Sequence, residues 1–341
     1  MEPDTNDGRS IEWPDGESTP SDEPVLRVIY TSISRLQGPV LAEMRRIRDQ
    51  AGRHNGPDGI RVALLHKSGY FVQWAEGPPA AVDRLLERVT MDSRHHGLQV
   101  LHRSLGRRRL FRPWIGAIVQ SDEVPAVMAA RVRRMTRSGP GEAVNQEPAQ
   151  VWAWLCAPPQ PDMPRPGGAG LRVMLLSARG RHSFDLLRWV AEHYRRPIVS
   201  RRFAAAADDV PDVAGDYLDL PHAVMPGGLR LMAYARQGLA MGVVHAFMPD
   251  HGAVVICLDS DGKRNGQLVD RLLTVCDLVQ CRLPIVGLGM AQSGQESLAE
   301  RVCSMGHEWL DAKVPTGLVP NAQLWASLYP VLGRLAAARS D

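Results

Sequence analysis

The most informative residue in the sequence is a glutamine inside an apolar stretch. Gln73 lies in a predicted strand over residues 70–74, where a buried amide costs free energy unless it finds hydrogen-bonding partners. Upstream, a predicted strand over residues 26–32 carries Tyr30 and Ser32, whose spacing of two places both on one face. An amide both donates and accepts hydrogen bonds, and a tyrosine can supply an electron and a proton. These side chains could therefore form hydrogen bonds to a bound polar group and take part in electron or proton transfer.

A histidine and an asparagine lie between these two strands. His54 and Asn55 follow a predicted helix and precede the turn Gly56-Pro57-Asp58-Gly59. Taken singly, Asn55 is an ordinary helix C-terminal residue, and a tyrosine on a strand usually packs in a core. The order and spacing of the whole set, more than any one member, indicate a site.

Hydrophobic periodicity places these residues in an α+β domain over residues 25–120. We predict an antiparallel sheet with both helices on one face and a cleft between the helices that a flat ring could enter. A hairpin is expected at Lys67-Ser68-Gly69. The expected elements are strands at 26–32, 60–66, 70–74, 98–104 and 114–120 and helices at about 39–52 and 79–90.

The run Gly69-Tyr70-Phe71-Val72-Gln73-Trp74-Ala75-Glu76-Gly77-Pro78-Pro79-Ala80-Ala81-Val82, with Tyr30 upstream, resembles the BLUF family of flavin-binding blue-light sensors. The resemblance spans about residues 25–120 and implies a ferredoxin-like β-α-β-β-α-β-β sandwich with FAD as its cofactor. It implies that Tyr30 is the redox tyrosine, that Asn55 holds the pyrimidine edge, and that the Gln73 amide is rearranged after light absorption. The residues it assigns to the flavin site are Tyr30, Ser32, His54, Asn55, Gln73, Arg88, Asp92 and Trp114.

Two departures from the family pattern keep an alternative open. Arg61-Val62 stands where the family usually has Thr-Gly, and Gly116 stands where it has a methionine. A chain that has lost flavin and keeps the fold as an interaction scaffold is therefore the first alternative.

Composition and charge exclude several classes of protein. The 341 residues are enough for two domains, and 44% hydrophobic with 23% charged residues is typical of globular protein. A net charge of +3 makes nucleic acid an improbable partner, and the arginines at 103, 107–109 and 112 are expected on a solvated hairpin. No apolar run is long enough to cross a membrane.

Cysteine usage and the first residues point to the cytoplasm. Five cysteines without CxxC spacing favour reduced, buried thiols over disulfides or zinc. Residues 1–24 are acidic and rich in Pro, Ser and Gly, which predicts a disordered tail and not a signal peptide.

Residues 121–169 are expected to hold a helix at 124–137 and a Pro/Gly-rich linker with an apolar clasp at 151–155. Residues 170–341 alternate between strand and helix, which predicts a doubly wound α/β domain. The expected elements are strands at 171–176, 198–203, 229–234, 254–258 and 284–288 and helices near 184–190, 266–281, 294–304 and 321–339.

The layout of this second domain resembles a Ras-like GTPase whose nucleotide motifs are missing. The phosphate loop Ser177–Ser183 has no lysine, Ala235–Gly238 lacks the switch carboxylate, and Gly289–Gln292 replaces the guanine-reading motif. Asp259 and Asp261 are expected to shape a turn in preference to binding a cation. We therefore predict a non-catalytic pseudo-GTPase output domain that binds a protein, with a GTPase-like nucleotide-binding regulator as the second alternative. Self-association into a homo-oligomer is left open.

Overall fold

The structure is a computed structural model. It describes residues 23–110, 114–119, 123–137, 147–156, 170–178, 180–204, 213–235, 239, 242–290, 295–314 and 320–339. Expectations for most of the tail, for Arg112 and for most of the linker fall outside the described residues.

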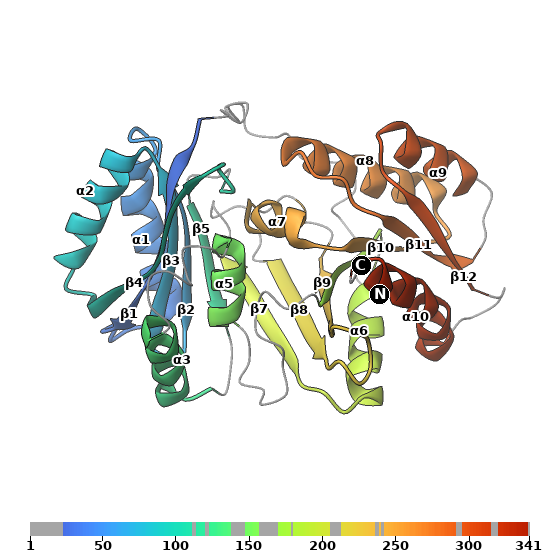
Figure 1. Ribbon diagram of the computed structural model, residues 1–341, viewed down its shortest axis with the longest axis horizontal. Coiled ribbons are helices and arrows are strands. Elements are labelled where there is room, and N and C mark those ends of the chain that lie inside the picture. Colours follow the sequence, from blue (N-terminus) through green and yellow to red (C-terminus); the bar gives the residue numbers. More distant parts are fainter. Residues whose placement is uncertain are drawn as a thin grey trace, which may run out of the picture.

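The N-terminal half (residues 23–156) has the predicted order of elements. Figure 1 shows them as β1 (Val25–Ser34), α1 (Val40–Asn55), β2 (Arg61–Lys67), β3 (Tyr70–Gly77), α2 (Pro79–Thr90), β4 (His95–Gly106), β5 (Trp114–Val119), α3 (Pro125–Arg137) and α5 (Pro148–Cys156). The turn between β2 and β3 consists of Ser68 and Gly69, which adopt φ of 48° and 74° as a tight two-residue hairpin requires.

The sheet of this half differs from the prediction in one pairing. Strands β1, β3, β4 and β2 pair antiparallel, but β5 runs parallel to β2, so the sheet is mixed and not purely antiparallel. Because β4 lies beside β1 and β5 lies beside β2, the chain crosses the sheet between them. The expected hairpin around Arg107–Arg109 is therefore wrong.

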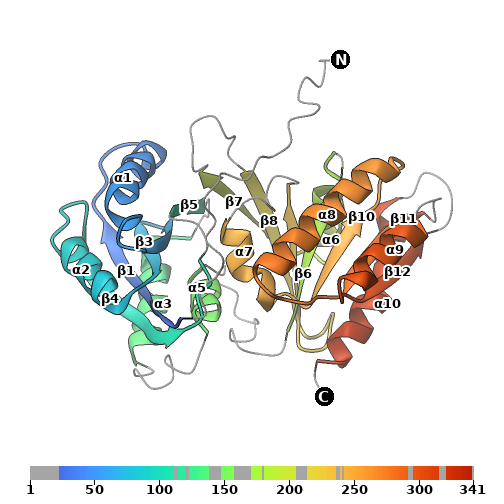
Figure 2. The ribbon, with the colours of Figure 1, turned by 90° about the horizontal axis from the view of Figure 1, so that it is seen from above.

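Alternation along each strand separates the two faces of this sheet. Residues such as Tyr30, Val62 and Phe71 face α1 and α2. Their neighbours Ile29, Ala63 and Trp74 face the opposite side, where α3 and α5 cover them. Both helices predicted for residues 25–120 thus lie on one face (Figure 2).

The C-terminal half (residues 170–339) is a doubly wound α/β unit. Its elements are β6 (Leu171–Ser177), α6 (His182–His193), β7 (Ile198–Ala204), β8 (Val213–Leu220), β9 (Leu229–Tyr234), α7 (Gly242–Phe247), a 3-10 turn (Met248–Asp250), β10 (Ala253–Cys257), α8 (Gly262–Leu278), β11 (Ile285–Met290), α9 (Gln295–Ser304), β12 (Trp309–Val314) and α10 (Asn321–Ala337). The sheet order is β7-β8-β9-β6-β10-β11-β12, with β9, β6, β10, β11 and β12 parallel and β7 and β8 antiparallel. Helices α8 and α9 pack on one face, and α6 and α10 on the other. The sequence prediction missed β8, β12, α7 and the 3-10 turn.

The two halves share one twelve-stranded sheet. Strand β5 pairs antiparallel with β7 from Gly116↔Ala204 to Val119↔Arg201, which joins the two sets of strands edge to edge. Helix α5, which contains the predicted apolar clasp at 151–155, lies between the halves (Figures 1 and 2). There Trp74 of β3 packs against Trp152 of α5 and Phe247 of α7, with ring centroids 6.2 and 6.1 Å apart. One hydrophobic cluster therefore spans the junction.

The turn expected at Asp259 and Asp261 can be compared with the structure. Asp261 caps α8 by accepting from the N–H groups of Lys263 and Arg264, and Asp259 accepts from the N–H of Asp261, as a turn-shaping pair does.

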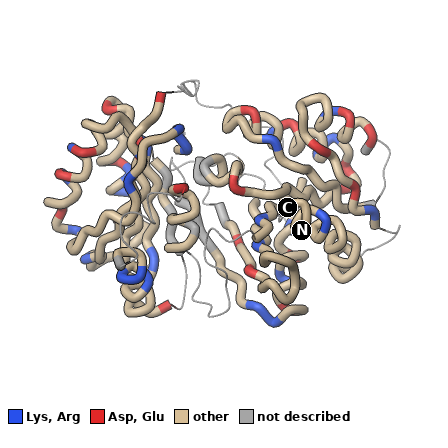
Figure 3. The backbone as a smooth tube through the Cα atoms, in the orientation of Figure 1, with Lys and Arg blue, Asp and Glu red and all other residues tan. Residues whose placement is uncertain are grey.

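The described residues contain no group of three or more acidic, His or Cys side chains that could hold a metal. Lys, Arg, Asp and Glu are scattered over both halves (Figure 3). None of the helices in the described ranges is long and apolar enough to cross a membrane.

A buried histidine in the C-terminal half gives a pH-dependent prediction. His251 is 1% exposed, and burial, reinforced by the charge of Arg172, lowers its pKa to about 4. Because an unfolded histidine titrates near 6.5, the unfolded chain takes up a proton between pH 6.5 and 4 that the folded chain does not. We expect the free energy of unfolding to fall by about 3 kcal/mol over this range. The His251→Asn variant should lose much less, whereas His182→Asn, at an exposed position, should behave like wild type. Urea titrations at pH 7, 5.5 and 4.5 give the free energy of unfolding at each pH. If this free energy fell equally with pH in wild type and in His251→Asn, the prediction would be contradicted.

Candidate functional site

A pocket opens between α1 and α2 on the outer face of the N-terminal sheet. It encloses about 820 Å³, counted with the solvent space at its mouth. Its floor comes from β1, β2, β3 and β5 and its walls from the two helices. The lining residues are Tyr30, Ser32, Ile47, Gln50, Ala51, His54, Asn55, Val62, Leu64, Phe71, Gln73, Leu85, Arg88, Val89, Asp92, Arg94, His95 and Trp114.

All eight site residues expected from the sequence line this one pocket. Tyr30 and Ser32 reach it from β1, Gln73 from β3 and Trp114 from β5. The other four residues come from the C-terminal ends of the two helices. His54 and Asn55 are the last residues of α1, Arg88 lies in the last turn of α2, and Asp92 follows that helix.

Tyr30 and Gln73 are direct neighbours. They are paired residues in the antiparallel register of β1 and β3, so their side chains lie next to each other on the same face. Burial, reinforced by the negative charge of Asp92, raises the pKa of Tyr30 well above its usual value. The hydroxyl therefore stays protonated at neutral pH and is a hydrogen-bond donor toward the pocket.

Within the part of the chain that the structure describes, three polar atoms of the pocket lining are buried without a hydrogen-bonding partner: Tyr30 Oη, Ser32 Oγ and His95 Nδ1. Burial lowers the pKa of His95, which favours its neutral ring. Buried polar groups in native proteins are almost always paired. Three unpaired atoms around one cavity indicate that a polar ligand supplies their partners.

The mouth of the pocket carries an ion pair. The guanidinium of Arg94 donates to both carboxylate oxygens of Asp92, at 2.9 and 3.0 Å from Nε. Burial raises the pKa of Asp92, but the hydrogen bonds and charge of Arg94 outweigh it, so the carboxyl titrates below its usual range. Arg94 and His95 line the pocket although the sequence singled out neither, because Arg94 lies in the turn after α2 and His95 is the first residue of β4, where periodicity marks neither residue.

The two departures from the family pattern affect the pocket differently. Arg61 does not line the pocket, whereas Val62 does, so the bulky cation does not fill the space between the helices. Gly116 lies directly under the ring of Trp114. A Cβ atom at position 116 would come within 1.9 Å of the indole Cη2 atom. The absence of a side chain there is what allows the indole to take its observed position.

This close approach gives a prediction for Gly116→Ala. The new methyl group must displace the Trp114 ring from the pocket wall, because the contact is far below van der Waals distance. We expect a destabilisation of about 1–3 kcal/mol, typical of overpacking, together with a change in Trp114 fluorescence. Gly38→Ala is a matched control, since nothing lies within 4 Å of a Cβ there. Urea unfolding followed by fluorescence reports both quantities, and identical curves for the two variants would contradict the prediction.

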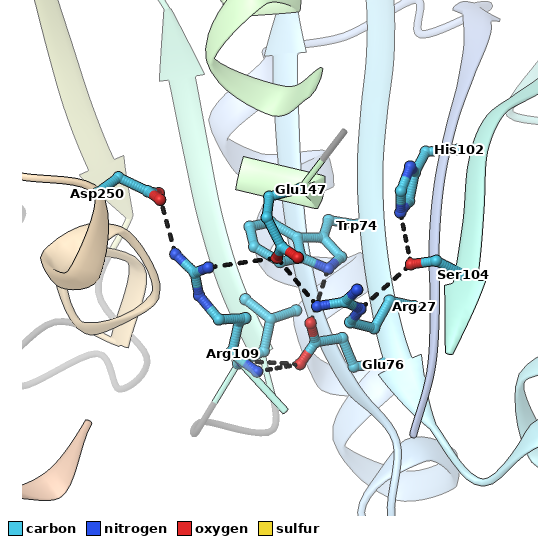
Figure 4. A network of polar contacts seen from close by, with 9 residues as sticks. Arg27, Trp74, Glu76, His102, Ser104, Arg109, Glu147 and Asp250 are labelled. Atoms are coloured by element: carbon cyan, nitrogen blue, oxygen red, sulfur yellow. Dashed lines mark hydrogen bonds and ion pairs between the residues drawn. The ribbon is translucent and has the colours of Figure 1, made fainter. Parts of the chain in front are cut away.

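A second polar cluster lies on the opposite face of the sheet, behind the pocket (Figure 4). Its centre is Glu76 of β3, which is 0% exposed. Its carboxylate accepts from Trp74 Nε1 at 3.0 Å and from the backbone N–H groups of Arg109 and Leu110 at 2.7 and 2.8 Å. Burial raises the pKa of Glu76, and the two backbone donors oppose this. Glu76 thus fixes the segment that leads from β4 to β5.

Arg109 extends this cluster to the C-terminal half. Its Nη2 donates to Asp250 Oδ2 at 2.9 Å, and its Nη1 lies 3.5 Å from Glu147, which also binds Arg27 at 3.1 Å. Figure 4 shows the Arg109 side chain between these carboxylates. The sequence interpretation of this run as solvated is therefore wrong for Arg108 and Arg109, which are partly buried, whereas Arg107 is exposed. A run of charges does not reveal the carboxylates and carbonyl groups that face it.

Comparison with known proteins identifies a family for part of the chain. Residues 25–116 match the BLUF family model, described as sensors of blue light using FAD. A photoactivated adenylate cyclase subunit beta from Euglena gracilis is 34% identical over 82 residues, which are 24% of this chain and 10% of that protein. Residues 25–116 are therefore similar to the BLUF family, and the chain spans about a tenth of the length of this curated relative.

Two solved structures are similar to the same part. BlrB, a BLUF protein in its dark state, is 24% identical, with 40% of this chain and 94% of that chain covered at a TM-score of 0.26. BlsA in its ground state is 20% identical, with 40% and 91% covered at a TM-score of 0.29.

The pocket residues fit the flavin group that this family is described as using. A flavin ring edge offers carbonyl oxygens and ring nitrogens. The unpaired Tyr30, Ser32 and His95 atoms and the amides of Asn55 and Gln73 can satisfy such groups. The apolar side chains of Ile47, Val62, Leu64, Phe71, Leu85 and Val89 can pack against the faces of the ring.

Proposed function

We propose that this protein is a blue-light photoreceptor that binds FAD between α1 and α2 and responds through the hydrogen bonds of Tyr30 and Gln73. The observation that carries the proposal is the convergence of all eight expected residues on one pocket that holds three unpaired buried polar atoms. The family match over residues 25–116 also supports it.

Each residue has a distinct role in this proposal. When bound, the flavin absorbs blue light and becomes a strong acceptor of electrons. The amide of Asn55 would hold the ring edge, and Tyr30, from its position on β1, could supply an electron and a proton to it. Gln73, paired with Tyr30 in the sheet, then turns or tautomerises its amide and exchanges its hydrogen-bonding partners.

The C-terminal half is proposed to be a non-catalytic output domain that binds a protein. Its strand order β8-β9-β6-β10-β11-β12, with an antiparallel β8, supports a Ras-like layout. The sequence motifs for nucleotide binding are missing. Exchanging the partners of one or two hydrogen bonds changes the free-energy difference between two conformations by about 1–3 kcal/mol. Moving their populations from 1:99 to 99:1 needs about 5.5 kcal/mol. A graded change in partner affinity is therefore expected.

The colour of the purified protein tests the photoreceptor proposal. The full chain should be yellow, or become yellow on reconstitution with FAD, and its absorption should shift reversibly to the red in blue light. Colourless protein that cannot be reconstituted would favour the flavin-free interaction scaffold instead.

A second candidate is a nucleotide-binding regulator. It is favoured by the loop after β6, where α6 begins at His182 and the buried hydroxyls of Ser177 and Ser183 lie 3.2 Å apart. GTP titration of the full chain and of Arg181→Ala tests it by calorimetry. Affinity for GTP that is lost in the variant would overturn the non-catalytic proposal.

A further inference from the structure

Helix α8 ends in a turn that brings two cysteines together. The N–H of Cys281 donates to the carbonyl oxygen of Cys276 at 3.0 Å, and Gln280 adopts a left-handed backbone with φ of 49°. This is the Schellman arrangement, in which the first and sixth residues of the turn lie side by side and their side chains touch. The sequence scan for CxxC spacing could not find this pair, because the contact is made by the helix-ending turn.

The two thiols are hydrogen-bonded to each other, and they differ in exposure and acidity. Cys276 is 0% exposed, whereas Cys281 is 9% exposed. The hydrogen bond to Cys281, together with burial, raises the pKa of Cys276. The same hydrogen bond lowers the pKa of Cys281 against the effect of burial, and the charge of Arg282 adds to this. Cys281 is thus the less deeply buried of the two and the one whose pKa is lowered, and Cys276 is its fully buried neighbour.

We propose that Cys276 and Cys281 form an oxidation site that a peroxide converts into a disulfide. The thiolate of Cys281 attacks one oxygen of hydrogen peroxide, so that an S–O bond forms, the O–O bond breaks and hydroxide leaves. The sulfur of Cys276 then attacks the Cys281 sulfur, an S–S bond forms and the S–O bond breaks. The hydroxide released from the Cys281 sulfur takes up the proton of the Cys276 thiol and leaves as water. Hydrogen peroxide is the two-electron oxidant of the overall reaction.

The site lies at the junction of the two halves. Gln280, within the turn, accepts a hydrogen bond from the guanidinium of Arg107, which belongs to the segment between β4 and β5. Two residues further along that segment, Arg109 binds Asp250 and its N–H binds Glu76. A bond between residues 276 and 281 would fix the turn that carries Gln280. The redox state of the pair therefore acts on a contact between the two halves.

Peptide mass spectrometry tests the site directly. The full chain carrying Cys303→Ser, which removes the one thiol that is exposed among the described cysteines, is treated with hydrogen peroxide, alkylated under denaturing conditions and cut with trypsin. Residues 272–282 form one tryptic peptide that contains both cysteines and no other. We expect this peptide to become about 2 Da lighter than the dithiol and to resist alkylation until a reductant is added.

Three comparisons make the result decisive. Cys257 is buried alone, and burial raises its pKa to about 12, so it should react at least about tenfold more slowly. In Cys276→Ser, oxidation should stop at a sulfenic acid on Cys281 that dimedone traps. In Cys281→Ser, Cys276 should remain a thiol. Full alkylation of both cysteines after peroxide, or oxidation no faster than at Cys257, would overturn the proposal. These measurements on the cysteines do not depend on whether the protein binds flavin.

Discussion

Replacing Gln73 by leucine is expected to leave a yellow protein whose absorption no longer shifts to the red in blue light. Leucine is similar in size and fits a pocket wall that already contains Val62, Leu64 and Phe71, so flavin should still bind. It has no group that can donate or accept a hydrogen bond. Because Gln73 is the residue paired with Tyr30, the rearrangement proposed here has no other side chain at that position to carry it.

The measurement is a pair of absorption spectra, in the dark and under blue light, on protein saturated with FAD. Gln99→Leu is a matched control, since Gln99 is an exposed residue on β4 that pairs with Thr31 and lies outside the pocket lining. It should keep the full shift. A red shift that survives in Gln73→Leu would refute the assigned role, and loss of flavin binding in Gln73→Leu would show that the amide holds the ring instead.

The pocket could be predicted from the sequence because it depends on short-range rules. Alternation on a strand places Tyr30 and Ser32 on one face, and helical periodicity aims the apolar faces of α1 and α2 at the same side of the sheet. Once the order of elements was known, the cleft between the helices followed. The positions of Arg88, Asp92 and Trp114 needed the family resemblance as well, since none of them is marked by periodicity.

The contacts between the halves could not be predicted in this way. Pairing of β5 with β7 joins residues about 85 positions apart, and nothing in either strand specifies its partner. The same holds for Arg109 and Asp250, which are 141 positions apart in sequence. The antiparallel strand β8 was missed although Tyr217, Leu218 and Leu220 are buried, because Gly215, Asp216 and Asp219 interrupt its apolar pattern.

The buried carboxylate of Glu76 connects the pocket with these long-range contacts. Gln73 faces the pocket, and the next residue, Trp74, faces the opposite side, where its indole N–H binds Glu76. Glu76 in turn holds the backbone of Arg109, whose side chain reaches Asp250 of the C-terminal half. Gln73 is therefore connected to the junction by the peptide bond to Trp74 and a short series of hydrogen bonds. The contribution of Glu76 to stability shows how firmly this series of contacts is held.

The Glu76→Gln variant is expected to lose about 2–4 kcal/mol of unfolding free energy. One carboxylate oxygen faces the indole N–H of Trp74, and the other faces the N–H groups of Arg109 and Leu110. Glutamine has only one oxygen, so in either orientation its NH₂ group meets a donor, and at least one buried N–H loses its acceptor. The loss is large because the residue is fully buried and no water replaces the missing acceptor at low energetic cost.

Urea unfolding at pH 7 measures this loss as a lower midpoint with an unchanged slope. Glu87→Gln makes the same chemical change at an exposed position on α2 and should alter stability by less than about 0.5 kcal/mol. If Glu76→Gln were as mild as Glu87→Gln, the carboxylate would not be what fixes the 107–110 segment. Amide hydrogen exchange separates the local from the global effect, because Arg109 and Leu110 should lose protection in Glu76→Gln under conditions where β1 and β3 keep theirs.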